Sequence, residues 1–373
     1  MKKIFVTKPF LPKWEEYQNY LKIAFENQTL TNNGFLHENF EKALTNKLNI
    51  HNISLINNGT IALELSIRAL NLKGKIITTP YSFMATANSI LLSGLEPIFI
   101  DIEDNGFNLD PDLIEEVNDK DVSAILPVNV YGIPCNNSKI EEIAKNRGLK
   151  VIYDSAHCFG VKENGESILN WGDISTLSFH ATKIFHTFEG GAITTANENL
   201  KNKIDQLRNF GFQSDGDVIA LGTNGKMNEA QAAMGLALIP YIDEIITKRK
   251  QRFNLYIEYL KNIPGIKLLS IPDDVEYNYA YFPILIQQDF PLTRDELFNK
   301  FQENNIYPRK YFYPLITNFS LYKNYNIISK HKIANAQKIA DSVLCLPLYP
   351  DLTEDDVSRV CDVIKKISCY KRY

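Results

Sequence analysis

The chain reads Ile53-Ser54-Leu55-Ile56-Asn57-Asn58-Gly59-Thr60-Ile61-Ala62-Leu63 where a short apolar run changes into a helical pattern. Residues 53–56 are too few for a helix and are rich in isoleucine, so we predict a buried strand there. Gly59 permits a tight turn, and the helical spacing begins near Thr60. A strand that leads directly into a helix is the unit from which α/β domains are built.

This unit recurs as far as Thr195. The predicted strands are Ile53–Ile56, Ile76–Thr78, Pro97–Ile102, Ala124–Val130, Val151–Tyr153, Thr176–Phe179 and Ala192–Thr195. The predicted helices between them are Thr60–Leu70, Ala85–Ser93, Pro111–Val117 and Ser138–Arg147. The alternation predicts an α/β fold with a large, mostly parallel sheet. Ligands of such sheets bind at the carboxyl ends of the strands, so the residues that follow each strand are the first candidates for a site.

A second, smaller α+β domain is predicted after the sheet. Asn228–Leu238 and Asp243–Leu260 have helical patterns, and the second is long and charged. We place the domain boundary between residues 1–240 and 241–373. Thr353, followed by Glu354, Asp355 and Asp356, predicts the start of the last helix, because a capping threonine precedes acids in the first turn.

Bulk composition excludes several classes of function. The 373 residues are 45% hydrophobic and 23% charged with a net charge of -4, which does not favour binding to nucleic acid or to an anionic membrane. We see no apolar stretch of the roughly 20 residues that a membrane-spanning helix needs and no signal-peptide pattern at the start. The five cysteines include no Cys-x-x-Cys pair, so we expect neither a disulfide framework nor a metal, and a cytoplasmic location.

The turn at Gly59, Thr60 and Ile61 is a candidate phosphate site. The free amides at a helix N-terminus suit a phosphate group. An ordinary capped helix is the alternative, since the glycine-rich pattern of a P-loop is missing. Two acids also follow strands, Asp154 and Asp101, and either carboxylate could face a ligand or serve as a helix cap or salt-bridge partner.

Lys183 follows a predicted buried strand and precedes Gly190-Gly191. A lysine held in a partly desolvated site is a usable Schiff-base amine, although most lysines are solvated surface groups. The same region holds Ser178, a possible phosphate ligand, and His180 and His186, which are either ligands or hydrogen-bonded structural histidines. Phe83 follows another strand and could lie on a ligand ring or in the core.

The order of these stretches, each at a strand end, resembles that of the DegT/StrS-type nucleotide-sugar aminotransferases. These are pyridoxal-phosphate (PLP) enzymes with the aspartate-aminotransferase fold, also called fold type I. The resemblance covers nearly the whole chain. It is carried by Asn58-Gly59-Thr60, Pro80–Phe83 with Ala85–Ala87, Asp154–His157, Ser178–Lys183 and Glu189–Ala192.

The resemblance implies a role for each candidate. Lys183 is the amine that binds PLP covalently, and Asp154, in preference to Asp101, pairs with the pyridine nitrogen and keeps the ring an electron sink. Phe83 stacks on the ring, and His157 lies beside its hydroxyl. The phosphate is held by the amides of Thr60 and Ile61, next to Gly59, by Ser178, and by Asn224 of a neighbouring subunit, which implies a homodimer with shared active sites. Many relatives have Tyr-Arg where this chain has Gly225-Lys226, so contacts of that arginine are not carried over.

A narrower resemblance concerns the substrate. Val6–Pro12, Leu30–Gly34 and Asn224–Met227 are similar to those family members that aminate C4 of dTDP-4-keto-6-deoxy-D-glucose with L-glutamate, for bacterial surface polysaccharide (O-antigen). The residues that the resemblance places near the nucleotide-sugar are Thr31, Asn32, Asn33, His180, His186, Arg309 and Tyr311.

Three alternatives remain at this stage. The first is a 3-keto sugar or a UDP-linked 4-keto sugar as substrate. The second is a sugar dehydratase of the same fold, which the presence of Lys183 and the absence of clustered cysteines disfavour. The third is a PLP-binding regulatory protein without turnover.

Overall fold

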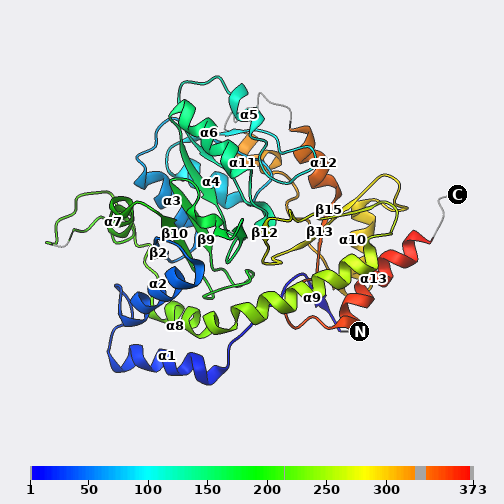
Figure 1. The fold of residues 1–373 in the computed structure, drawn as a ribbon, viewed down its shortest axis with the longest axis horizontal. Helices are drawn as coiled ribbons and strands as arrows, with labels where there is room; N and C mark the ends of the chain where they lie inside the picture. Colours follow the sequence, from blue (N-terminus) through cyan, green and yellow to red (C-terminus); the bar gives the residue numbers. More distant parts are fainter. Residues whose placement is uncertain (1, 214, 324–332, 370–373) are drawn as a thin grey trace.

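A computed structural model describes residues 2–213, 215–323 and 333–369 and has at its centre a seven-stranded sheet (Figure 1). The strand order is β2-β10-β9-β6-β5-β3-β4. β10 is antiparallel to both of its neighbours, and the other neighbouring pairs are parallel. The strands are β2 (Asn52–Ile56), β3 (Lys75–Thr78), β4 (Glu96–Phe99), β5 (Val122–Leu126), β6 (Lys150–Asp154), β9 (Ile174–Ser178) and β10 (Gly191–Thr195). The predicted α/β class and mostly parallel sheet are confirmed.

Two predicted strands end earlier than expected. The run predicted at Pro97–Ile102 is a strand only over Glu96–Phe99, and the run at Ala124–Val130 only over Val122–Leu126. Pro127 has no amide to donate to a neighbouring strand, and a short 3-10 turn, η1, follows at Val130–Gly132. The apolar residues beyond these strand ends are still buried, which is why the hydrophobic pattern alone extended the strands.

Helices cover both faces of the sheet. Ile76 and Ile77 are adjacent on β3 but belong to different hydrophobic clusters, as expected for side chains that alternate across a strand. One cluster includes side chains of α3, α4 and α7, and the other includes those of α5 and α6. The bounds are α3 (Gly59–Ala69), α4 (Met84–Leu92), α5 (Asp112–Glu116), α6 (Asn137–Arg147) and α7 (Glu198–Leu207).

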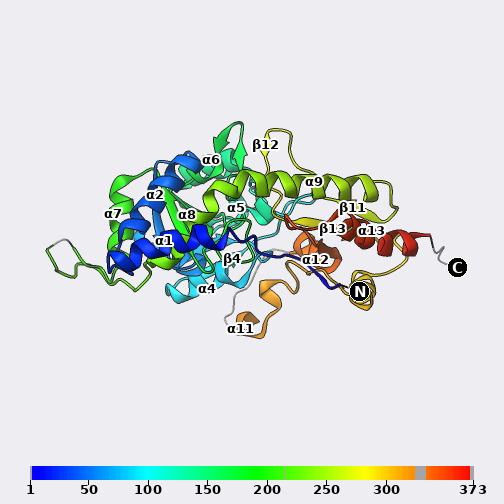
Figure 2. The ribbon, with the colours of Figure 1, turned by 90° about the horizontal axis from the view of Figure 1, so that it is seen from below.

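Two N-terminal helices, α1 (Trp14–Glu26) and α2 (Phe35–Leu48), pack against α8 (Glu229–Leu238). Of these three helices, the sequence pattern predicted only α8. The buried Glu229 joins α8 to α2, because its carboxylate accepts hydrogen bonds from the amides of Leu36 (2.8 Å) and His37 (3.1 Å) at the start of α2. α8 and the long α9 (Ile242–Leu260) run nearly end to end along one side of the molecule (Figures 1 and 2).

The C-terminal part has its own antiparallel sheet, in the order β11-β13-β15, and a separate hydrophobic cluster. The predicted capping threonine is confirmed, since Thr353 accepts from the amide of Asp356 at the start of α13 (Glu354–Ser368). The first strand, β1 (Ile4–Phe5), pairs with β14 (Ile306–Tyr307), so the N-terminus lies with the C-terminal part. The domain boundary near residue 241 stays a prediction.

The remaining elements are short or belong to this C-terminal part. They are β7 (Lys162–Glu163), β8 (Glu166–Ser167), β11 (Ile266–Leu268), β12 (Val275–Glu276), β13 (Phe282–Ile286), β15 (Val343–Leu346), α10 (Arg294–Glu303), α11 (Ser320–Lys323), α12 (Ala334–Ser342) and the 3-10 turns η2 (Ile168–Asn170), η3 (Ile239–Tyr241) and η4 (Ile316–Asn318). Within the described ranges, no helix is long and apolar enough to span a bilayer.

Gly235 sets how closely α2 and α8 pack. A Cβ on this residue would lie 2.2 Å from Cζ of Phe40, whose fully buried ring also contacts Phe179 and Phe185. We predict that Gly235→Ala lowers the free energy of unfolding by about 2 kcal/mol. Overpacking costs up to about 3 kcal/mol, and the better helix propensity of alanine offsets roughly 1 kcal/mol. Urea unfolding measures the change. In a Phe40→Leu background the same substitution should be neutral or stabilising, and an equal loss in both backgrounds would contradict the packing explanation.

Candidate active site

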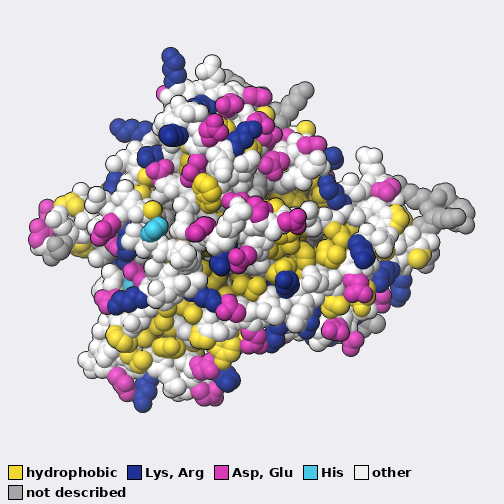
Figure 3. Space-filling model, viewed as in Figure 1, with side chains coloured by type: hydrophobic (Ala, Val, Ile, Leu, Met, Phe, Trp, Pro, Cys, Tyr) yellow, Lys and Arg dark blue, Asp and Glu magenta, His cyan; other side chains and the backbone are white. Residues whose placement is uncertain are grey.

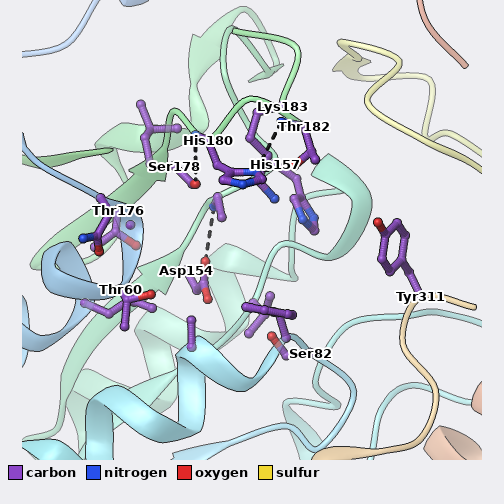
Figure 4. A pocket seen from close by; sticks show the side chains of 18 of the residues that line it. Thr60, Ser82, Asp154, His157, Thr176, Ser178, His180, Thr182, Lys183 and Tyr311 are labelled. Atoms are coloured by element: carbon purple, nitrogen blue, oxygen red, sulfur yellow. Dashed lines mark hydrogen bonds between the residues drawn. The ribbon is translucent and has the colours of Figure 1, made fainter. Parts of the chain in front are cut away.

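A cavity of about 300 Å³ lies at the carboxyl ends of β6 and β9, beside the first turns of α3 and α4. This is the edge at which the sequence predicted a site, and Figure 4 shows side chains from several segments converging on it. Its lining residues are Asn58, Gly59, Thr60, Leu63, Ser82, Phe83, Ala85, Val128, Asp154, Ala156, His157, Thr176, Leu177, Ser178, His180, Thr182, Lys183, Glu189, Tyr281, Tyr311 and Phe312.

One end of the cavity is the turn between β2 and α3. Asn58 caps the helix, because its side-chain oxygen accepts from the amide of Ile61 at 2.9 Å. A Cβ on Gly59 would lie 3.0 Å from Cβ of Ser178, so a side chain here would need the turn or Ser178 to shift by a few tenths of an ångström. Gly59, Thr60 and Ser178 therefore form one end of the cavity. Ile61 does not line it, and its amide is already bonded within the turn.

Asp154 is a buried acid that lines the cavity. Its carboxylate accepts from the hydroxyl of Thr86 (2.8 Å) and from the amide of Ala156 (3.2 Å). Burial raises the pKa of Asp154, whereas the Thr86 hydroxyl, the Ala156 amide and the positive charge of Lys183 lower it. The carboxylate is thus oriented from two sides.

The rival acid, Asp101, has a structural position instead. Its carboxylate accepts from the amides of Asn335 and Ala336, both at 2.8 Å, at the start of α12, and from its neighbour Ile102 at 2.9 Å. It does not line the cavity. Asp101 fixes the C-terminal part of the chain to the edge of the sheet.

Lys183 is partly buried in the loop after β9, and Figure 4 shows it on the same side of the cavity as His157. Burial lowers the pKa of the Lys183 amine to about 8, although the carboxylate of Asp154 acts in the opposite direction. A neutral amine is therefore accessible near physiological pH. This property distinguishes Lys183 from a solvated lysine and makes it a competent nucleophile.

His157 presents one ring nitrogen to the cavity. Its Nδ1 accepts from the backbone amide of Tyr131 at 3.1 Å, so in the neutral ring the proton lies on Nε2. Burial keeps the ring neutral by lowering the pKa of His157 well below its usual value. The ring stacks on Phe312 with an interplanar angle of 2°, which fixes its orientation. His157 can therefore donate a hydrogen bond from Nε2.

Aromatic side chains form the other walls. Phe83 lines the cavity and is 59% exposed, so it is not a core residue. Tyr311 enters from the side opposite to the sheet (Figure 4). Tyr281 and Phe312 also line the cavity and were not predicted, because nothing in the local pattern of their segments shows that they face the sheet.

The two candidate histidines have different positions. His180 lines the cavity, and its Nε2 lies 3.5 Å from the Glu189 carboxylate. His186 does not line it. The Nε2 of His186 donates to the carbonyl of Phe10 at 2.7 Å, and its Nδ1 accepts from the amide of Phe188 at 3.4 Å. His186 thus holds the N-terminal segment in place, the structural alternative that the sequence left open.

The other sequence candidates lie outside the cavity of this chain. Thr31, Asn32 and Asn33 are exposed in the turn before α2, and Arg309 is exposed beside β15. Asn224 is exposed at the base of the loop between α7 and α8, where its side-chain oxygen accepts from Lys226 at 3.1 Å. No cluster of metal-ligating side chains occurs among the residues that the structure describes.

Comparison with known proteins identifies the family. The sequence profile of the DegT/DnrJ/EryC1/StrS aminotransferase family matches residues 13–365. The chain belongs to this family. It is 46% identical over 366 residues to the dTDP-4-amino-4,6-dideoxy-D-glucose transaminase of Shigella dysenteriae, covering 98% of this chain and 99% of that protein.

Solved structures of aminotransferases share the fold. The structure of DesI with its TDP-sugar product superposes with a TM-score of 0.94 at 30% identity, covering 99% of this chain and 93% of that one. A structure described as a putative PLP-dependent aminotransferase from Bacillus cereus gives a TM-score of 0.89 at 26% identity, covering 98% and 100% of the two chains. The predicted fold is confirmed, and this protein is a PLP-dependent enzyme of the sugar-aminotransferase family.

The residues present fit this cofactor. The Gly59 turn leaves space that a side chain would fill, next to the amide of Thr60 and the hydroxyl of Ser178, and could hold the phosphate. Asp154 would pair with the pyridine nitrogen, His157 would donate to the ring hydroxyl and Lys183 would provide the amine. All of them line one cavity.

The depressed pKa of Lys183 predicts a pH dependence in the protein without cofactor. The amine is protonated below about pH 8 and reactive above it, whereas an ordinary lysine needs a pH near 10.4. Acetylation of Lys183, followed against pH by peptide mass spectrometry, should have its midpoint near 8. Asp154→Asn removes the charge that favours the ammonium form, so the midpoint should fall further. A midpoint near that of ordinary lysines, or a rise in Asp154→Asn, would contradict this assignment.

Proposed function

We propose that this enzyme transfers the amino group of L-glutamate to C4 of dTDP-4-keto-6-deoxy-D-glucose. The product is dTDP-4-amino-4,6-dideoxy-D-glucose with an equatorial amine, and it serves surface-polysaccharide (O-antigen) synthesis. The observation that carries the proposal is the 46% identity, over nearly the full length of both chains, to a transaminase named for this product. We further propose that it acts in the cytoplasm, where its five free thiols would persist.

Lys183 has two roles in the proposed reaction. Its amine, reactive because burial lowers its pKa to about 8, would hold the cofactor, and it would be free to act as a base once the amino donor is bound. The freed amine accepts a proton from the donor's α-carbon and returns it at the cofactor's reacting carbon; in the second half-reaction it moves the proton in the reverse direction. An amine with a pKa of about 8 can both accept and return a proton near physiological pH, so it is suited to both directions.

The surrounding residues orient the reacting groups. When bound, pyridoxal phosphate supplies an electron sink for the charge that develops at carbon. Asp154, whose carboxylate is fixed by Thr86 and Ala156, would keep the ring nitrogen protonated. Phe83 would lie against the ring face, and His157 would donate to the ring hydroxyl. We place the sugar at the side lined by His180 and Tyr311.

We also propose a homodimer with shared active sites. The loop between α7 and α8 projects from the body of the chain (Figures 1 and 2) and carries exposed apolar residues, with Leu221 exposed to 87%. Hydrophobic side chains are also visible over the region of α1 and α8 (Figure 3). Exposed apolar surface of this kind is typical of an interface. Asn224, at the base of the loop, would contact the phosphate in the partner's site.

The substrate assignment is tested directly. Purified enzyme with PLP and L-glutamate should convert dTDP-4-keto-6-deoxy-D-glucose into a product whose NMR spectrum shows an equatorial amine at C4. The 3-keto isomer and UDP-linked 4-keto sugars should be at least about 100-fold poorer by kcat/KM, because a site built for one hydroxyl pattern leaves polar groups unpaired with another. Nitrogen at C3, or reaction only with UDP-sugars, would refute the assignment. Absence of any turnover, with no change of the cofactor's absorbance on adding glutamate, would support a regulatory protein instead.

The roles of the lysine and of the acid are tested by substitution. Lys183→Ala should lower kcat by about 10²- to 10⁴-fold or more, because the proton transfer loses its base. Asp154→Asn should lower it by about 100-fold or more, because the neutral amide cannot stabilise the protonated ring. Asp101→Asn is the matched control: it should reduce thermal stability but leave the kcat of folded enzyme within about threefold. Loss of activity in Asp101→Asn together with a normal Asp154→Asn enzyme would reverse the choice of acid.

Mixing two variants tests the shared site. If Asn224 acts across the interface, a hybrid of Lys183→Ala and Asn224→Ala subunits contains one intact site, formed by the lysine of one chain and the asparagine of the other. Refolding the two inactive variants together should restore about a quarter of wild-type activity, since half of random dimers are hybrids with one working site of two. No recovery, in a sample that sedimentation shows to contain dimers, would place Asn224 in its own subunit's site, and an Asn224→Ala variant that is active by itself would place Asn224 outside both sites.

A further inference from the structure

A chain of hydroxyl groups leads to the carboxylate of Asp154. The Oγ1 of Thr86 lies 2.8 Å from Oδ2 of Asp154, and the Oγ of Ser82 lies 2.8 Å from the same Oγ1. Thr86 is fully buried, and Ser82 is 5% exposed where it lines the cavity. Neither residue was a candidate from the sequence.

The direction of these hydrogen bonds follows from the number of available protons. An ionised carboxylate only accepts, so Thr86 uses its single hydroxyl proton to donate to Asp154. Thr86 then has only lone pairs left for Ser82, and Ser82 must donate. While Asp154 is charged, Ser82 can therefore only donate to Thr86, and Thr86 only to Asp154. Donation in this direction polarises each hydroxyl in turn and stabilises the negative charge of the carboxylate. A protonated Asp154 would lose this advantage.

The fold fixes this arrangement. α4 begins directly after Phe83, and Thr86 lies in the first turn of this helix, whose N-terminal end favours a nearby negative charge. The amide of Ala156 binds the other oxygen, Oδ1, at 3.2 Å. The carboxylate is therefore held by one donor from α4 and one from its own segment, and the α4 donor is the one that a side-chain substitution can remove.

We propose that Thr86, supported by Ser82, is a positioning residue that keeps Asp154 ionised and aimed at the pyridine nitrogen of the cofactor. The proposal rests on the role proposed above for Asp154. The need for such a donor is physical, since burial by itself favours the neutral carboxyl and a neutral carboxyl cannot hold a protonated ring. Threonine at this position offsets that penalty without adding a charge.

Other titratable groups near the end of β6 also influence the ionisation of Asp154. They are Lys183 from the loop after β9, whose positive charge favours the ionised form of Asp154, and His157 and Cys158 from the segment after β6. Burial keeps the His157 ring and the Cys158 thiol neutral by lowering the first pKa and raising the second. From α4, the group that reaches the carboxylate is the uncharged hydroxyl of Thr86. Lys183 is therefore the other charge that a pH experiment must consider, and it is unchanged in all the variants below.

The test is the affinity for PLP measured against pH by fluorescence titration of the purified protein. Thr86→Val keeps the shape of the side chain and removes the donor. It should weaken PLP binding about 10- to 100-fold near neutral pH, the range for a hydrogen bond to a charged group. Because the carboxyl pKa rises when its donor is lost, the acid-side fall in affinity should begin about one pH unit higher. Thr86→Ser should restore both properties to within about threefold.

Two further variants separate this proposal from the role of Asp154 itself. In an Asp154→Asn background, Thr86→Val should have no additional effect, because the charge that it supports is gone. If Asp154→Asn alone leaves PLP affinity unchanged, the role of Asp154 fails. If Asp154→Asn weakens PLP binding but Thr86→Val changes neither the affinity nor the pH at which the affinity begins to fall, only the role of Thr86 is overturned.

Ser82→Ala tests the same chain without touching the helix. It should weaken PLP binding by about threefold and shift the acid-side fall in affinity to higher pH, as Thr86→Val does. The reason is that the Thr86 hydroxyl, no longer polarised by a donor from Ser82, forms a weaker hydrogen bond to Asp154. If Thr86→Val does not fold, this variant decides the question alone, and an unshifted acid-side fall in affinity in Ser82→Ala would then overturn the proposal.

Discussion

The Lys183 amine and the Asp154 carboxylate lie in one desolvated cavity, and burial acts on both in the same sense, toward the neutral form. It lowers the pKa of the amine to about 8 and raises that of the acid. An unsupported buried charge costs several kcal/mol, so the carboxylate is ionised only where donors and an opposite charge compensate for lost water. Much of the surrounding structure provides such compensation, through Thr86, Ala156 and the lysine itself.

The sheet brings the compensating groups together. β6 lies between β5 and β9, so the segments that follow these parallel strands leave the sheet at the same edge. β5 stops before Pro127, and the chain then turns so that the amide of Tyr131 reaches His157. The early end of that strand is therefore what allows the backbone to fix the tautomer of a cavity histidine.

The C-terminal part completes the cavity. Tyr281, Tyr311 and Phe312 form walls opposite the sheet, and the Tyr81 hydroxyl donates to the Tyr311 carbonyl at 3.0 Å. Asp101 binds the start of α12 to the same edge of the sheet. These contacts cover the site with aromatic surface, which excludes water and strengthens the electrostatic interactions inside. Asp101, which the sequence offered as a rival to Asp154, thus helps to hold the C-terminal part of the chain against the sheet.

The sequence by itself determined the alternation of strands and helices, the mostly parallel sheet and the stretches that carry the family resemblance. Each of these is encoded locally, in periodicity, in turn residues such as Gly59 and in short motifs such as Ser178–Lys183. Strand ends at Pro97–Ile102 and Ala124–Val130 were placed too far along, because buried residues beyond a strand are as apolar as those within it. The N-terminal helices were not predicted, although α2 packs on α8 with well-defined contacts.

Where the sequence offered two residues of the same type, only the tertiary structure decided which one lines the cavity and which one has a structural role. It separates Asp154 from Asp101 and His180 from His186, and it brings Tyr281, Phe312, Ser82 and Thr86 to the site. The physical reason is that a side chain's pKa, hydrogen-bond partner and access to the cavity depend on groups that are distant in the chain. Thr86 and Asp154, 68 residues apart, acquire their relation only when α4 lies against the end of β6.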